Sequence, residues 1–353
     1  MKHHYMKITI LAPAVLLAVT LASCGGGGSG STLIAPYQNV VTNIPAPSAG
    51  YNSDETAVLT QLTDMRLGAG YLTPNKALNT AASNHVNFLI SNNLLSPGYL
   101  TTLQSGGILG GHYENAAATN LTYYTGASPQ DRAIAAGYNG TVEEVITFSA
   151  ATTTGTDCVN SLGDSVYHVI DLISPFIDLG VSFQADSASS VNVCAIEMGV
   201  ASTTLGQLPV SGPVVYPYNG LTNVLPTYYI QAEAPSPTTL VGAGPFGHPA
   251  VVSLYTWASP VLSSGNIVIH DFSISTGGGA TLPAQVLANS GVTSTPITGP
   301  ALTADNVIPR PGFVVLVPTS PLTPGTTYDI SFSATVNGQS VSKTWSFTTG
   351  PQN

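Results

Sequence analysis

Charge is the scarcest property of this chain of 353 residues. Only 7% of the residues are charged, with 7 lysines and arginines against 17 aspartates and glutamates, whereas a typical soluble domain has about 25%. The net charge of -10 and the small basic total exclude a general affinity for nucleic acid. The hydrophobic fraction of 43% excludes a disordered chain. Glycine, proline, serine and threonine replace the missing charges, a mixture typical of exported proteins rich in strands and loops.

The N-terminus carries a hydrophobic run that is too short to span a membrane. Ile8–Leu21 has 14 residues, and a membrane-spanning helix needs about 20. A short basic segment, bounded by Lys2 and Lys7, comes directly before this run. The arrangement predicts that residues 1–23 are a secretory signal peptide.

The end of this run, residues 21–24, resembles a bacterial lipobox, whose cysteine is lipidated and becomes the mature N-terminus. An ordinary signal peptide with an incidental Cys24 is the alternative. Residues 24–52 are rich in glycine and serine and are predicted to be a flexible linker. The lipobox resemblance implies a lipoprotein of the bacterial cell envelope. Because Gly25 rather than aspartate follows the cysteine, the resemblance implies that the lipid anchors it to the outer membrane rather than the inner membrane, facing the periplasm or the cell surface.

Cysteine is also scarce, with three in the chain. Besides Cys24, only Cys158 and Cys194 remain, and a single pair in an exported protein predicts a disulfide bond. Closing a loop of about 37 residues would stabilise the fold by about 3–4 kcal/mol. Two free, buried thiols are the alternative.

The chain divides into two halves of different character near residues 202–217. Residues 54–200 hold thirteen of the seventeen acidic residues and most of the helical periodicity. Helices are predicted from residue 53 to the stop at 68 and at 75–92, 129–136 and 158–173, followed by a strand hairpin at 179–183 and 191–200. Strands of the second half are predicted at 250–257, 266–274, 313–317, 326–336 and 340–348, with an Asn337-Gly338 turn between the last two.

Two acidic residues and one histidine of the first half are candidates for a polar site. His112 follows two glycines, and Glu114 comes two residues later. In an extended segment these side chains would point to the same side and converge, and a solvated loop pair is the alternative. Glu144 belongs to an acidic pair flanked by β-branched residues. It lies either at a strand edge or facing a lined pocket, and an exposed turn is the alternative.

His168 lies off the apolar stripe of the predicted 158–173 helix, close to Asp164 and Asp171. A histidine in that position faces water, a groove or a partner. The other histidines beyond the signal peptide are predicted to be a hydrogen-bonded core residue at His85 and structural or surface residues at His248 and His270.

The order of these pieces resembles the bacterial CAP superfamily, relatives of the cysteine-rich secretory, antigen 5 and plant pathogenesis-related proteins. The resemblance covers about residues 54–200 and rests on seven short motifs in the same order. They begin at Leu62, Leu78, His112, Asp131, Glu144, Ser165 and Leu179. The resemblance implies an α-β-α sandwich over residues 53–202, with helices on both faces of a small antiparallel sheet. The Gly and Asn that flank the family's glutamate are missing around Glu144.

The resemblance also implies a groove lined by two histidines and two acidic residues. His112 and His168 match the histidines, Glu144 matches one acid, and Glu114 is the candidate for the second. Two imidazoles with carboxylates can hold Zn²⁺ or a similar divalent ion, so His112 and His168 are candidate metal ligands. An open position on such a metal would activate water for hydrolysis.

The last strands resemble bacterial Ig-like modules. Residues 322–328 match the segment that leads the final hairpin of such a module, and Trp345 and Phe347 match its end. Residues 210–353 are therefore expected to form an all-β Ig-like sandwich. The fold class expected for the whole chain is α+β, a CAP-type sandwich followed by the Ig-like module.

Three functions remain open from the sequence. The first is an envelope-anchored binding module whose groove takes a small ligand, a lipid, a glycan, a peptide or a divalent metal. The second is a metal-dependent hydrolase similar to a peptidase. The third is a structural or adhesive surface protein that makes its contacts through the Ig-like module.

Overall fold

The computed structural model of the protein has a mixed α and β fold, with few helices and many strands in several sheets. The structure describes residues 38–95, 111–201, 206–210, 212–230, 233–242, 244–256, 259, 262–295, 300–308 and 310–351. The predicted signal peptide at 1–23, Cys24 and the first part of the linker lie outside the described residues. Within these ranges, every helix is too short or too polar to cross a membrane.

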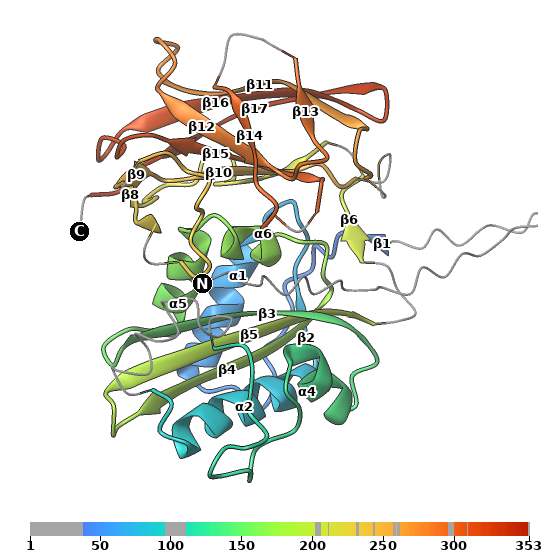
Figure 1. The fold of residues 1–353 in the computed structure, drawn as a ribbon, viewed down its shortest axis with the longest axis vertical. Coiled ribbons are helices and arrows are strands. Elements are labelled where there is room, and N and C mark those ends of the chain that lie inside the picture. The colour runs from blue at the N-terminus through green and yellow to red at the C-terminus, as the bar shows by residue number, and fades with distance from the viewer. Residues whose placement is uncertain are drawn as a thin grey trace, which may run out of the picture. The chain divides into compact units, whose positions relative to one another are not determined.

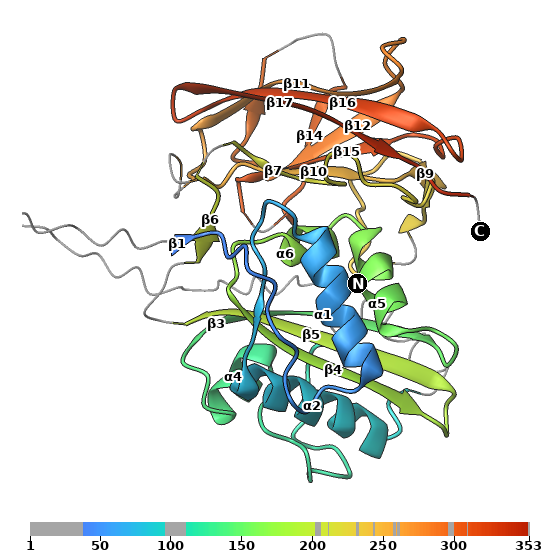
Figure 2. The ribbon, with the colours of Figure 1, turned by 180° about the vertical axis from the view of Figure 1, so that it is seen from behind.

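A four-stranded sheet with the strand order β2-β4-β5-β3 organises the first half of the chain. Its strands are β2 (Thr73–Pro74), β3 (Gly140–Ala150), β4 (Asp178–Asp186) and β5 (Val191–Ala201). Helices α2 (Lys76–Ser91) and α4 (Pro129–Ala135) cover one face (Figure 1), and α1 (Ser53–Met65), α5 (Gly155–Gly163) and α6 (His168–Leu172) lie on the other (Figure 2). Alternate side chains of β5 divide between these layers. Val193 and Ala195 pack with α2, whereas Cys194 and Ile196 join the core of α1 and α5.

The predicted starts of three helices are confirmed, each by a side chain that caps the first turn. Asn52 Oδ1 accepts a hydrogen bond from Glu55 N, and the Glu55 carboxylate accepts one from Asn52 N, both at 2.9 Å. This reciprocal capping box begins α1. Asn75 caps α2, and Ser128 caps α4. Because such caps contribute about 1 kcal/mol each, the local sequence defines these boundaries.

The single helix predicted at 158–173 is wrong, because two helices, α5 and α6, occupy this region. Glu233 from the second half of the chain lies at this break. Its carboxylate accepts hydrogen bonds from the backbone amides of Val166 at 2.9 Å, Tyr167, and His168 at 3.2 Å. A carboxylate at a helix N-terminus satisfies amides that have no partner within the helix. The start of α6 is therefore set by a residue far away in the sequence.

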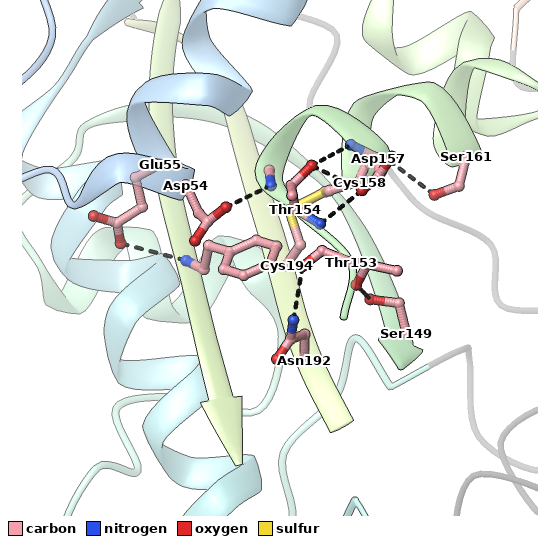
Figure 3. Close-up of a disulfide and its surroundings, with 12 residues drawn as sticks. Asp54, Glu55, Ser149, Thr153, Thr154, Asp157, Cys158, Ser161, Asn192 and Cys194 are labelled. Carbon is pink, nitrogen blue, oxygen red and sulfur yellow. Dashed lines mark hydrogen bonds between the residues drawn. A yellow bond between two sulfur atoms is a disulfide. The ribbon is translucent and has the colours of Figure 1, made fainter. Parts of the chain in front are cut away.

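The predicted disulfide bond between Cys158 and Cys194 is confirmed, with Cα atoms 6.3 Å apart. It joins helix α5 to strand β5 (Figure 3). Beside it, the start of α5 packs tightly on α1. Gly155 N donates a hydrogen bond to Asp54 Oδ1 at 2.9 Å, and a Cβ at Gly155 would meet Asp54 O at 1.9 Å. Only glycine fits this contact, which brings α1, α5 and the sheet together at one corner.

Two further sheets form the second half of the chain, a five-stranded one with the order β14-β12-β15-β10-β7 and a four-stranded one with the order β13-β11-β16-β17. The strands of the first are β7 (Val214–Tyr216), β10 (Ala250–Ser253), β12 (Ala284–Ala288), β14 (Leu302–Ala304) and β15 (Phe313–Pro318). Those of the second are β11 (Ile267–Thr276), β13 (Thr293–Ser294), β16 (Thr327–Val336) and β17 (Gln339–Thr348). Two short pairs complete the described strands: β1 (Gln38–Asn39) with β6 (Gln207–Leu208), and β8 (Thr227–Tyr228) with β9 (Phe246–Gly247).

The hairpin of β16 and β17 confirms the predicted turn at Asn337 and Gly338. Their φ angles are +50° and +78°, as the tight turn that matches the twist of two strands requires. Side chains from the two sheets share one core, in which Phe272 and Trp345 lie with Leu316. This shared core is what packs the two sheets of the second half face to face.

A second core connects the two halves of the chain. It includes Leu172 and Phe176, at α6 and just after it, together with Phe246, Phe313 and Val315 of the second half. Residues 36–353 accordingly form one compact unit. The domain limits at residues 53–202 and 210–353 stay predictions.

Candidate functional site

Five ionisable side chains are buried together between the sheet and helices α2 and α4. This buried charge cluster consists of His85 on α2, Glu114, Arg132 on α4, Glu144 on β3 and Glu197 on β5. Each side chain is fully buried. Charged residues are almost never fully buried unless they are paired, so the pairing within the cluster decides which of them carry charge.

His85 shares a proton with Glu114. Its Nε2 lies 2.8 Å from the carbonyl oxygen of Gly111 and its Nδ1 lies 2.9 Å from Glu114 Oε1. Because a carbonyl oxygen can only accept, Nε2 carries a hydrogen. The contact to Glu114 then holds one further proton, on His85 or on the carboxyl group. Gly111 has a φ of +82°, in the region that favours glycine, and this conformation presents its carbonyl to His85.

Glu144 is the ionised acid of the cluster. One oxygen lies 2.9 Å from His112 Nδ1, and the other accepts a hydrogen bond from Arg132 at 2.8 Å. Burial raises the pKa of Glu144, but the charge of Arg132, followed by those of His85 and His112, outweighs burial and lowers the pKa well below its usual range. Arg132 also donates to the carbonyl oxygen of His112 at 2.8 Å. Arg132 thus fixes both partners of the His112–Glu144 pair.

Glu197 is the neutral acid of the cluster. It stands directly opposite Glu144 in the register of β3 and β5. Burial raises its pKa well above the usual range, and the charge of Glu144 raises it further. Two carboxylates placed side by side cannot both ionise at low cost. Glu197 therefore keeps its proton while Glu144 carries the charge.

Three of the four predicted groove residues, His112, Glu114 and Glu144, come together around the buried charge cluster. Glu144 lies on β3, one of the two edge strands of the sheet, and its side chain points inward toward α2. His112 is the exposed member of the group, with 20% of its side chain accessible. Within the part of the chain that the structure describes, no hydrogen bond engages its Nε2.

His168 does not join this group, and the predicted convergence of all four residues is corrected here. Its Nδ1 lies 3.2 Å from Glu233 Oε1, on the face of the sheet that carries α6. Neighbouring residues of a strand point to opposite faces. Glu144 therefore faces α2, whereas Glu143 faces α6 and pairs with Arg310. The sheet separates His168 from His112.

The zinc site expected at His112 and His168 does not fit this arrangement. The two histidines have separate carboxylate partners on opposite faces of the sheet. His85, which contacts Glu144 as His112 does, already uses both ring nitrogens in hydrogen bonds. Among the described residues, no three His, Cys, Asp or Glu side chains are grouped so that they could hold a metal ion.

A cavity of about 320 Å³ lies against the buried charge cluster. Phe88 and Tyr113 contribute aromatic walls, Asn92 and Asn115 contribute polar residues, and Glu114 borders the cavity with its side chain fully buried behind the wall. Glu114 Oε2 is buried and forms no hydrogen bond in the described part of the chain. An unpaired buried oxygen is costly, so a donor group brought by a ligand would stabilise it.

Sequence reasoning missed several members of these sites. His85 was expected to be a hydrogen-bonded core residue, and it is one, but its partner Glu114 was not foreseen. Arg132 appeared only as part of a family motif. Glu197 and Glu233 gave no signal beyond their rarity in an uncharged chain. The rarity of arginine in the chain was the one available hint, because an arginine that is buried needs acidic partners.

No protein-family model matches the chain, and no curated protein matches it.

Proposed function

We propose that the protein is a ligand-binding lipoprotein of the bacterial envelope, with a CAP-type first half and an Ig-like second half. The observation that carries this proposal is the cavity of about 320 Å³ beside Glu114, a carboxyl group with a buried, unpaired oxygen. Helices on both faces of a four-stranded sheet are the arrangement that the CAP resemblance implies. Two sheets packed face to face support the Ig-like identity of the second half.

The lining of the cavity limits the chemistry of the ligand. Phe88, Tyr113 and Leu94 favour an apolar body, because aromatic and aliphatic walls gain from the removal of apolar surface from water. The unpaired Oε2 of Glu114 favours a ligand with a hydroxyl or amino group that can donate a hydrogen bond. The ligand is therefore a small amphipathic molecule, such as the polar end of a lipid, a glycan unit or a short peptide.

A hydrolase is the second candidate function, and the geometry of His112 favours it. Glu144 holds Nδ1 of the ring at 2.9 Å, and the partly exposed ring turns its other nitrogen away from this contact. A histidine oriented by a buried carboxylate can take a proton from water through Nε2. Glu144 would then stabilise the imidazolium that forms. This candidate needs no metal.

Binding of one probe for each ligand class tests the first proposal. Isothermal titration of the mature full-length protein would use monopalmitoylglycerol, an N-acetylglucosamine trimer and a tetraglycine peptide. We expect one probe to bind, and Glu114→Gln to weaken it about tenfold or more, because the variant removes a charge-assisted acceptor. His270→Ala is the control, because His270 lies in the second half and its ring bonds there to Thr295 and Thr335.

Failure of all three probes, or equal loss in the His270→Ala control, would contradict the binding proposal. Ester and peptide hydrolysis measured in parallel tests the second candidate. Turnover that persists in His112→Ala would rule out His112 as its base.

A further inference from the structure

A second cleft, separate from the Glu114 cavity, lies on the other face of the sheet. Its volume is about 460 Å³. Helices α1 and α5 of the first half form one wall, and the segment 216–225 of the second half forms the other. The cleft therefore exists only where the two halves of the chain meet.

The cleft is acidic. Asp64 comes from α1, Asp157 from α5 and Asp164 from the residue after α5, and no basic side chain is among the described residues of its lining. Asp64 and Asp157 are exposed, and neither forms an ion pair with a basic residue in the described part of the chain. Three acidic groups so placed create a negative potential at the cleft.

A buried histidine with unmet hydrogen bonds lies behind this wall. The His248 side chain is fully buried, and its Nδ1 lies 3.3 Å from Oδ1 of Asp164, a residue that lines the cleft. Neither ring nitrogen forms a hydrogen bond within the described residues. Tyr216, whose ring centroid is 6.1 Å from that of His248, also lines the cleft.

The two partners are both poorly solvated. Burial raises the pKa of Asp164 to about 7 and lowers the pKa of His248 to about 3. The ionised form of each group is therefore disfavoured in the free protein. A positive charge in the cleft would favour the ionised carboxylate of Asp164, which can in turn accept a hydrogen bond from His248.

We propose that this cleft binds an organic cation, a ligand that carries an amino or guanidinium group. Asp164 and Asp64 supply the opposite charge, and the rings of Tyr216 and Tyr218 supply aromatic surface, which attracts cations. Gln61, Asn160 and Ser161 add polar groups that can bond the remaining hydrogens of the ligand. A volume of about 460 Å³ suits a flexible amine or the end of a lysine or arginine side chain better than a bare ion. The inference does not rest on the Glu114 cavity.

Titration of the mature full-length protein with spermidine tests this proposal. We expect saturable binding that Asp164→Asn weakens about tenfold or more, because a buried charge partner is lost. Asp64→Asn should weaken it about two- to fivefold, as expected for an exposed pair. Asp329→Asn, which removes the same charge from β16 in the second half, is the matched control and should bind spermidine like the wild type.

Two further measurements make the result decisive. A neutral diol of similar length should not bind, and Ca²⁺ at the same concentration should not displace spermidine. Equal weakening in Asp329→Asn, displacement by Ca²⁺, or no saturable binding would overturn the proposal. Because Asp64 is exposed, Asp64→Asn keeps the test valid even if Asp164→Asn alters the fold.

Discussion

Glu144 and Glu197 stand directly opposite each other on β3 and β5, yet only one of them is ionised. Arg132 lies 2.8 Å from Glu144 and 3.7 Å from Glu197, so the shorter pairing selects which acid holds the negative charge. Burial and the charge of Glu144 keep the proton on Glu197. The two acids therefore have opposite roles in stability.

Glu144→Gln is expected to destabilise the protein by about 3–5 kcal/mol, because it leaves Arg132 buried without its closest carboxylate. Glu197→Gln is expected to be nearly neutral at a pH below the ordinary value of 4.5 and increasingly stabilising as pH rises from there toward the raised folded pKa, because over that range only the wild type must keep a proton on a buried carboxyl group. Urea unfolding at neutral pH measures both. Equal losses in the two variants would contradict the assignment of charge.

Asp164→Asn is expected to become more stable than the wild type as pH rises. The folded pKa of Asp164, about 7, lies above its ordinary value of 3.8, so the wild type loses stability as pH rises between these values. The asparagine variant lacks this loss, and it should exceed the wild type by up to about 4 kcal/mol at pH near 8. The difference should shrink toward zero near pH 4. A pH-independent difference in urea unfolding would show that Asp164 does not titrate as described.

Glu233→Ala is expected to destabilise α6 and the contact between the halves. Glu233 accepts hydrogen bonds from three backbone amides and from Tyr228 at 2.7 Å, so its loss leaves several buried donors unpaired. Burial raises its pKa, but the hydrogen bond and charge of His168 and the hydrogen bond of Tyr228 bring the pKa below the ordinary value. Its contribution is therefore full above the unfolded pKa and is lost as pH falls through the folded value.

Hydrogen exchange at the amides of residues 166–168 provides the readout for Glu233. We expect faster exchange in Glu233→Ala and partial protection in Glu233→Gln, which keeps one acceptor oxygen. Asp329→Asn serves as the control, and unchanged exchange in Glu233→Ala would refute the capping role.

Reduction of the Cys158–Cys194 bond is expected to cost about 3–4 kcal/mol of unfolding free energy, from the entropy of the loop that the bond closes. The Cys158→Ser, Cys194→Ser double variant should show the same loss. Mass spectrometry of peptides prepared without reductant should recover the two cysteines joined. Alkylation of both in that sample would contradict the structure.

The sequence predicted well whatever is decided locally. The helix starts predicted near residues 53, 75 and 129 are real, and Asn337-Gly338 marks a real hairpin, because neighbours in the chain make these contacts. The single pair of cysteines after Cys24 was enough to predict the disulfide bond.

The sequence failed where the partner lies far along the chain. Residues 158–173 have the periodicity of one helix, but Glu233, 65 residues after His168, caps a second one there. The same contact gives His168 a partner other than Asp164 and separates it from His112. Motif order alone could not show that Glu143 and Glu144 face opposite sides of the sheet.

The distant cap of α6 has a consequence for the order of folding during synthesis. A chain is synthesised from its N-terminus, so the amides of residues 166–168 emerge before Glu233 does. Until Glu233 arrives, the first half lacks the acceptor that starts α6 and the apolar residues that cover it. We expect the apolar residues of α6 to stay partly exposed until the second half emerges. The C-terminal sheets would then cover them and complete the fold of the first half.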